Sequence, residues 1–332
     1  MLMLVEKKPE CPPSQDGAPE GFAAPDVAAP PLQNELWLLG QPPLANLLDF
    51  VDSAVADPER FDRQALTAAW RRASAQYQAL EVSQPGIANA GEHRPLDAAL
   101  APLADEVRAH PSFRLSFDTL PTTFAMVDLD HLIVDQQHVT HDFVDAITPR
   151  VGPRPDPRTL FRLCMPLEAP AAPVQIQKVG SRRFTFRTRS LDLRFHAAAL
   201  LDPQLAQAHA SFGPVAGIVG LVVGFGCNFL NVVRVGKRVL LANGYHRAVA
   251  LRAAGIRHVP CVMQEASSVD ELQVIVKSRI ADAAEFYFES ARPPLLADFF
   301  DPRLSTLLPI RPRMRQIEVS FEVKDHLVCE GP

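Results

Sequence analysis

The chain has 332 residues, of which 47% are hydrophobic and 21% are charged. This apolar content is enough for a sizeable core and excludes a wholly disordered chain. The formal net charge of −5 and the pI near 6.1 exclude a chain-wide attraction to nucleic acid or anionic membranes, although a local basic patch is compatible with either.

The five cysteines lie far apart without CxxC spacing, which favours reduced thiols in a cytoplasmic protein. The start, MLMLVEKKPE, lacks a basic region followed by a long apolar run, so we expect no signal peptide. Residues 210–233 carry no charge and imitate a membrane span, but their five glycines, Pro214 and two asparagines argue against one. We expect a glycine-rich helix packed in the core there, followed by a loop and a strand, and no membrane partner.

Residues 1–33 are rich in proline, alanine and glycine, and we expect a disordered tail. In the next region, one apolar stripe recurs at helical spacing from Leu66 to Leu80 and another from Leu96 to Val107. The pair Pro42-Pro43 marks the start of a further helix, LANLLDFV. Residues 34–118 are therefore predicted to be helical.

Strand patterns are interspersed with helices from residue 119 onward. The run FAMVDLDHLIV predicts strands, and Thr140 is a candidate N-cap for a short helix, HDFVDAI. Glycine turns at Gly180-Ser181 and Gly236-Lys237 predict two hairpins. Apolar and polar residues alternate over residues 317–323, which predicts a strand with one exposed face.

The fold class is therefore mixed α/β, that is, α+β with a mixed sheet. Four segments follow from these patterns: a tail (1–33), a helical region (34–118), an α/β domain with an insertion near 150–210 (119–270), and a C-terminal extension of helix and strand (271–332).

The segment RVLLANGYHRAVALRAAGIRHVPCVMQ predicts a strand, a glycine turn, a helix and a second buried strand. Asn243-Gly244 permits the sharp turn, and Gly255 is suited to end the helix. His246 and Arg247 then fall in the first helical turn, where free backbone N–H groups and the helix dipole favour an anion. An arginine fork and a histidine donor at that point predict a small phosphate site. The alternative is an ordinary strand–turn–helix connection with a solvated Arg247 and a His246 that caps the helix or packs against it.

The same segment resembles the phosphate-binding segment of the ParB/sulfiredoxin superfamily, in which a strand ends in (Asp/Asn/Gly)-Gly-x-(His/Arg)-Arg and a G-x-x-x-V-P strand closes the unit. MVDLDHLIVDQQHVTHDFVDAI is similar to the opening strand, loop and helix of that fold. The resemblance implies a ParB/sulfiredoxin-like core with a nucleotide site at the turn. The matching residues are Asn243, Gly244, His246, Arg247, Gly255, Val259 and Pro260, and the implied site residues are Asn243, Gly244, Tyr245, His246 and Arg247.

Departures from the motif disfavour two branches of the superfamily. Sulfiredoxins carry a catalytic cysteine where this chain has Tyr245, and partitioning proteins carry Glu-Arg-Arg followed by a helix-turn-helix domain. Free-serine kinases keep Gly-x-His-Arg and use an upstream carboxylate as a base. The candidate carboxylates are Asp128, Asp130 and Asp135, and Asp135, in LIVDQQHV, is nearest to that position although the family's glutamate is absent. The resemblance therefore implies Asp135 as the catalytic carboxylate.

Together these features predict a protein that binds a nucleotide or another phosphate ligand. As an enzyme, it is expected to transfer a phosphoryl group from ATP or ADP, with Mg²⁺, to a small-molecule substrate. One alternative is a non-catalytic regulator or nucleic-acid-binding protein that uses the basic residues 178–194, and another is a scaffold whose nucleotide site has lapsed. A strand with Phe184 and Phe186 on a buried face and Arg187 on a solvated face explains the basic segment without a ligand.

A local cluster of His131, His138 and His141 with Asp135 and Asp142 has the residue types of a metal site. No distant fourth ligand is identifiable, so a polar loop with surface histidines is favoured and no metal ligand is assigned. Glycines 217–226 contain no complete dinucleotide or P-loop fingerprint.

Overall fold

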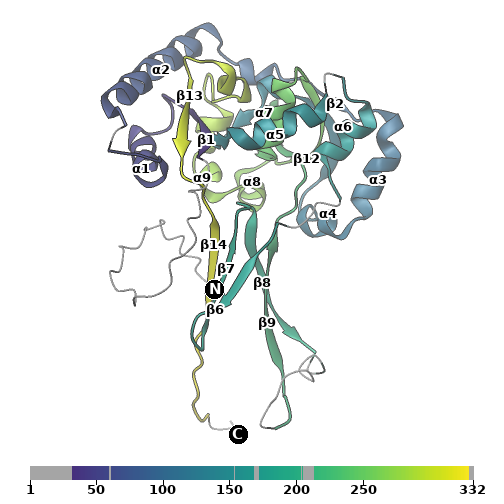
Figure 1. Cartoon of the computed structure of the whole chain (residues 1–332). Coiled ribbons are helices and arrows are strands. Elements are labelled where there is room, and N and C mark those ends of the chain that lie inside the picture. The colour runs from purple at the N-terminus through teal and green to yellow at the C-terminus, as the bar shows by residue number, and fades with distance from the viewer. Residues whose placement is uncertain are drawn as a thin grey trace.

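The structure, a computed structural model, describes residues 32–328 apart from residues 60, 153, 168–171, 203 and 205–212. The expected disordered tail therefore lies, except for its last two residues, outside the described range. The fold is mixed α/β, as predicted, with a body of helices and sheets from which long strands project (Figure 1). In the described part of the chain, no helix has the length and apolarity needed to cross a membrane.

A six-stranded sheet lies in the body, with β12 parallel to β10 and β11 parallel to β4. Its central strand β12 is almost continuously buried because both faces of the sheet are covered. The strands in spatial order are β2 (His93–Pro95), β3 (Thr122–Asp128), β12 (His258–Glu265), β10 (Asn231–Val235), β11 (Arg238–Asn243) and β4 (Ile133–Val134).

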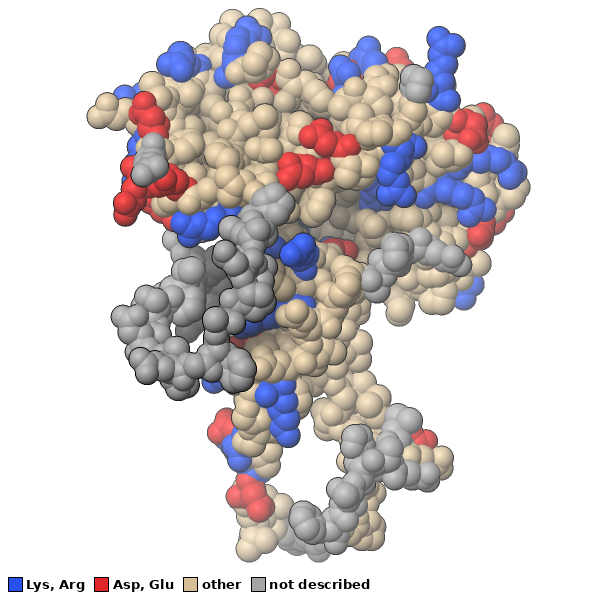
Figure 2. Space-filling view, viewed as in Figure 1, with Lys and Arg blue, Asp and Glu red and all other residues tan. Residues whose placement is uncertain are grey.

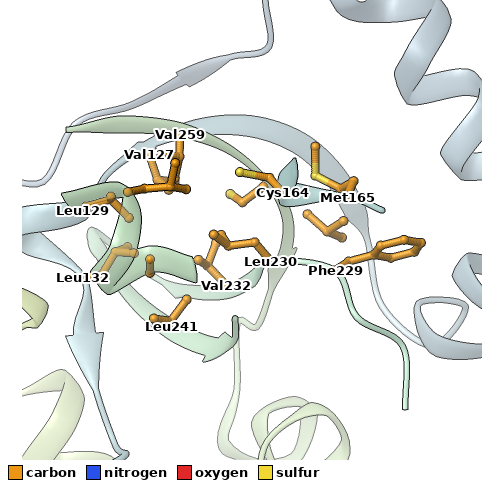
Figure 3. Close-up of a cluster of buried hydrophobic side chains, with 14 of the residues drawn as sticks. Val127, Leu129, Leu132, Cys164, Met165, Phe229, Leu230, Val232, Leu241 and Val259 are labelled. Atoms are coloured by element: carbon orange, nitrogen blue, oxygen red, sulfur yellow. The ribbon is translucent and has the colours of Figure 1, made fainter. Parts of the chain in front are cut away.

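The two faces of this sheet contribute to different cores because side chains alternate along each strand. Val232 and Leu241 belong to the large core (Figure 3), whereas Val233 and Leu240 belong to smaller clusters on the opposite face. Helix α5 packs on α7, and α6 packs against β12. The helices on the large core are α3 (Ala101–Ala109), α4 (Pro111–Ser116), α5 (His141–Val151), α6 (Pro157–Cys164) and α7 (Tyr245–Ala253); α8 (Val269–Ile275), α9 (Ser278–Ala281) and α10 (Ala284–Phe288) follow β12.

A second sheet, β13–β1–β5, joins segments that lie far apart in the sequence, since β1 (Gln33–Leu38) pairs with both β5 (His138–Thr140) and β13 (Ser305–Ile310). The strand β1 lies in the region for which only helices are predicted. The predicted helices themselves are confirmed: α1 (Leu44–Ala54) begins after Pro43, and α2 (Arg63–Ser83) buries the apolar stripe from Leu66 to Leu80.

The remaining strands form two small sheets that extend away from the body (Figure 1). One is β14–β7–β6, with β6 (Gln175–Lys178), β7 (Arg183–Thr188) and β14 (Arg315–Ser320); the other is the hairpin of β8 (Leu193–Leu201) and β9 (Ile218–Phe225). The expected glycine-rich helix within residues 210–233 is therefore wrong where this segment is described. Valines and glycines disfavour a helix there, and the pairing with β8 satisfies a strand instead.

Both hairpins predicted from glycine turns are confirmed, with Gly180 and Gly236 at positive φ. The predicted faces of β7 are only partly right. Phe184 and Phe186 are half-buried, while Thr185, on the face expected to be solvated, is buried. Thr140 does precede α5, but its hydroxyl donates to Glu35 rather than capping the helix.

Candidate functional site

The predicted glycine turn, Asn243-Gly244, joins β11 to α7. Each of its two residues has a specific role in the turn. Asn243 donates from Nδ2 to the carbonyl oxygens of Cys227 and Phe229, each at 3.0 Å. Gly244 has a φ of 95°, and a Cβ there would lie 3.1 Å from the Cα of Leu230. Helix α7 then begins without a side-chain cap. Glycine is needed at position 244 because a side chain there would be strained at this φ and would crowd the backbone of Leu230.

Arg247 is buried, so the alternative interpretation is wrong in expecting a solvated side chain at the helix start. Its guanidinium donates to the carbonyl oxygens of Leu163 at 3.1 Å and Cys164 at 2.8 Å, and to Oδ1 of Asn228 at 2.9 Å. Burial lowers the pKa of Arg247 from its ordinary value. The side chain joins the end of α6 to α7, so these donors are already used within the protein.

His246 is also held by internal contacts. Its Nε2 accepts the backbone N–H of Thr140 at 3.1 Å, and its ring meets Phe143 edge-on at 5.5 Å between centroids. Burial lowers the pKa of His246, with opposition from Glu35. The imidazole is therefore neutral with its proton on Nδ1, and Nε2 cannot donate to a phosphate in this arrangement.

Asp135 lies at the same sheet edge as the glycine turn. Strands β4 and β11 are parallel, with Val134 opposite Leu241, so the residues that follow them meet at one edge. The hydroxyl of Tyr245 accepts the backbone N–H of Asp135 at 3.0 Å and lies 2.5 Å from Oδ1 of the same residue. Burial, followed by the charge of Asp135, raises the pKa of Tyr245 well above its usual range. Tyr245 thus links the predicted carboxylate to the first turn of α7.

Two cations that the sequence reasoning missed also reach Asp135. Arg279 approaches its Oδ2 at 2.5 Å from Nη2 and 3.2 Å from Nε, and the Nζ of Lys277 lies 3.7 Å away. The carboxylate is almost fully enclosed, whereas more than half of each cationic side chain is exposed. One buried negative charge therefore faces two exposed positive charges. No spacing signal indicates this, because both cations lie far along the chain from Asp135.

A small pocket of about 130 Å³ opens beside Asp135. Gln41 contributes an Oε1 atom that is buried without a hydrogen-bond partner among the described residues. Ligand sites for larger molecules usually have about 300 to 1,000 Å³, so the pocket is too small to enclose a whole nucleotide. Asp135 is the charged residue in its lining, and Lys277 and Arg279 lie outside that lining. Its lining includes Leu38, Gln41, Tyr77, Val134, Asp135 and Tyr287.

The histidines of the suggested cluster bind separate carboxylates. His138 contacts Glu35, His131 lies 2.8 Å from Asp128, and His141 lies 3.0 Å from Asp145. Within the described ranges, no three His, Cys, Asp or Glu side chains are arranged to hold a metal ion.

Glu35 is the buried member of these pairs. It also accepts from Thr140 at 2.9 Å and from Arg313 at 3.0 Å. Burial alone would raise the pKa of Glu35, but these partners and His138 outweigh it and lower the pKa. This network ties β1, β5 and the segment before β14 together.

Comparison of the chain with protein-family models, with curated proteins and with solved structures finds no match in any of the three.

Proposed function

We propose that the protein binds a small phosphate-bearing ligand at the edge where β4 and β11 end. The observation that carries this proposal is the meeting of Asp135 with Lys277 and Arg279; of the three residues, only Asp135 lines the 130 Å³ pocket. The ligand's phosphate pairs with the two exposed cations, of which Arg279 supplies a planar donor fork and Lys277 a point charge. The resemblance of the turn to ParB/sulfiredoxin motifs supports the same edge.

The roles of the motif residues differ from a simple phosphate clamp. Nη1 and Nη2 of Arg247 and Nε2 of His246 form hydrogen bonds within the protein, so these side chains hold the turn and α7 in position. Arg279 is the residue that changes partner: it leaves Asp135 for the incoming phosphate. The released carboxylate can then orient an acceptor hydroxyl or a Mg²⁺ ion bound to the phosphate, which is what phosphoryl transfer requires.

A nucleotide such as ATP or ADP fits this proposal only through its terminal phosphate. The pocket is too small to enclose the base and ribose, which lie outside it. With a nucleotide bound, Mg²⁺ would neutralise phosphate charge at this edge. Phosphoryl transfer to a small molecule is the enzymatic form of the proposal.

Nucleic-acid binding through residues 178–194 receives less support. Arg183 pairs with Glu318 at 3.3 Å, Arg194 with Asp192 at 2.6 Å, and Arg187 donates to Gln316. Acidic residues thus offset part of the charge that phosphate neutralisation would need.

The test is a thermal-denaturation screen of the full chain with inorganic phosphate, ADP and ATP, each with and without Mg²⁺. A ligand at a hundred-fold excess over its Kd stabilises the folded state by about 2.7 kcal/mol. We expect Lys277→Ala to weaken binding at least about ten-fold. Asp135→Asn should retain binding while reducing any phosphoryl transfer.

Arg303→Ala is the matched control, because Arg303 is similarly exposed and pairs with Asp301, and neither residue lines the pocket or pairs with Asp135. The control should bind as the wild type does. The proposal fails if none of these ligands raises the melting temperature, or if the Lys277 and Arg303 variants bind equally well.

A further inference from the structure

The pocket beside Asp135 is walled mainly by apolar groups. Three prolines and three aromatic residues line it: Pro42, Pro43, Pro294, Tyr77, Phe286 and Tyr287. Glutamines contribute the uncharged polar side chains, and Asp135 is the charged residue of the lining. The volume of about 130 Å³ equals that of about four molecules of liquid water. A pocket of this kind selects a small group that is mostly apolar and carries few polar atoms.

Gln41 differs from the other polar groups of the pocket because one of its hydrogen bonds is missing. The amide of Gln136 donates to the carbonyl oxygen of His138 at 2.6 Å, and the hydroxyl of Tyr77 donates to Asp298 at 3.2 Å. The Oε1 atom of Gln41 is buried and accepts from no donor among the described residues. A buried acceptor without a donor is unfavourable. Because the last torsion of glutamine is soft, a donor that enters the pocket can pair with Oε1.

The backbone on both sides of Gln41 is held in place. Gly40 precedes it with a φ of 86°, and a Cβ there would lie 2.5 Å from the backbone of Ala73 in α2. Pro42 follows it, and the carbonyl oxygen of Pro42 accepts from the indole of Trp70 at 2.9 Å. Proline also restricts the conformation of the residue before it. The side chain of Gln41 therefore starts from a fixed point, as a residue that determines specificity requires.

The charges around the pocket favour an uncharged group inside it. Asp135 already pairs with Lys277 and Arg279, so an ammonium group would enter beside two positive charges. An anionic group would enter beside Asp135 without a cation in the described lining. Either unpaired charge is costly to bury. Over the face of the body in Figure 2, basic and acidic side chains are interspersed, so no large surface of one sign offsets that cost.

We infer that the phosphate-bearing ligand also carries a hydroxyl group on a short alkyl chain, and that Gln41 selects the ligand by accepting a hydrogen bond from this hydroxyl. The inference rests on the proposed function, because Lys277 and Arg279 hold the phosphate outside the pocket while the chain enters it. An alkyl chain of about three carbons has a suitable volume and packs against the prolines and aromatic rings. The ligand class is therefore a hydroxyalkyl phosphate.

The test is titration calorimetry of the full chain with inorganic phosphate, with propyl phosphate, and with two analogues of propyl phosphate that carry a terminal hydroxyl or a terminal amine. The hydroxyl analogue should bind to the wild type at least about ten-fold more tightly than propyl phosphate, because propyl phosphate leaves Oε1 of Gln41 unpaired. The amine analogue should bind more weakly than the hydroxyl analogue, because its ammonium group meets Lys277 and Arg279.

Gln41→Met keeps the length of the side chain and removes the amide. This variant should bind propyl phosphate and the hydroxyl analogue within about two-fold of each other. Gln78→Met is the matched control, because Gln78 is exposed on α2 and does not line the pocket. The control should keep the wild-type preference. Equal melting temperatures of the unliganded variants establish that both are folded.

Lys277→Ala separates this inference from the proposed function. It should weaken the binding of every phosphate compound alike and leave the preference for the hydroxyl unchanged. If binding depends on Lys277 but the wild type shows no such preference, or Gln41→Met retains it, the inference is overturned while the proposed function stands. Tighter binding of the amine analogue would also overturn it. If no phosphate compound binds, the proposed function fails, and the inference fails with it.

Discussion

Two consecutive hairpins of this chain have similar apolar sequences and opposite environments. Strands β10 and β11 are mostly buried, with Val232, Val233, Leu240 and Leu241 fully enclosed. Strand β8 is mostly exposed and β9 is mostly half-buried, and Leu193 is their one fully buried residue among those described.

The difference comes from what lies beside each hairpin. The β10–β11 pair has a further strand on each edge, β12 and β4, and side-chain clusters on both faces. Among the described residues, no further strand is hydrogen-bonded to the β8–β9 pair, and its neighbour is β14, which contacts β8. Apolar composition therefore indicates that a surface is to be covered, but neighbouring elements decide whether the cover comes from the same chain.

The largest expected difference between the two hairpins is the loss of stability when a leucine of each is truncated to alanine. Leu241→Ala leaves a cavity in the core and should lower the free energy of unfolding by about 2 to 5 kcal/mol. Leu200→Ala removes an exposed side chain and should change monomer stability by less than about 0.5 kcal/mol. Urea unfolding at low protein concentration measures both. Equal losses would mean that the hairpin is buried in the monomer.

A glycine pair tests the same contrast through the backbone. Gly244→Ala forces an alanine into a φ of 95° against the backbone of Leu230 and should cost about 1 to 3 kcal/mol. Gly220→Ala meets only the end of the Leu201 side chain in the hairpin, and that chain can rotate away. Urea unfolding should show little change for Gly220→Ala. A loss as large as that of Gly244→Ala would show the hairpin to be as tightly constrained as the turn.

The sequence predicts the buried hairpin well because its signals are local. Gly236-Lys237 and Asn243-Gly244 both mark turns, and the strands between and after them have lengths typical of buried strands. The segment that forms β9 is predicted as a helix because an apolar run without clear alternation does not distinguish helix from strand. Its partner strand, β8, lies earlier in the chain, and the segment between the two strands carries no hairpin signal.

The candidate site was only partly predictable for a related reason. Asp135 and the turn follow neighbouring parallel strands, so a fold resemblance suffices to bring them together. The burial of Arg247 depends on carbonyl groups at the end of α6, and Lys277 and Arg279 reach Asp135 from beyond β12. Such contacts are set by tertiary packing and leave no periodicity in the sequence.

Alkaline pH should lower the free energy of unfolding through groups buried in the core. The β8–β9 hairpin should contribute nothing to this pH dependence. Burial raises the pKa of Cys164 to about 12 and also raises those of Cys261 and Tyr245. Between the ordinary thiol pKa near 9 and 12, the unfolded chain loses protons that the folded chain keeps. Stability therefore falls as pH rises, by about 1.4 kcal/mol per pH unit for each such group.

Urea unfolding at a series of alkaline pH values measures this slope. Cys164→Ala removes one of the titrating groups, so its unfolding free energy should fall less steeply with rising pH than that of the wild type. Leu200→Ala removes no titrating group and should retain the wild-type slope. Identical slopes for the wild type and Cys164→Ala would show that the thiol ionises in the folded state as readily as in the unfolded chain.

The smallest effect concerns acid pH and His246. Burial lowers the pKa of His246, and His138 and Arg247 lower it further against the opposing effect of Glu35. The folded chain then keeps His246 neutral at a pH where the unfolded chain has bound a proton. Stability from this group is complete above the ordinary pKa of 6.5 and is lost as pH falls from there toward the folded-state pKa.

His246→Gln removes the titration and keeps an acceptor for Thr140, so its unfolding free energy should fall less steeply than that of the wild type between pH 7 and pH 5. His196→Gln, in the exposed β8, controls for the loss of one histidine. If the unfolding free energies of the two variants depend on pH in the same way between pH 7 and pH 5, the burial of His246 contributes no pH dependence to stability.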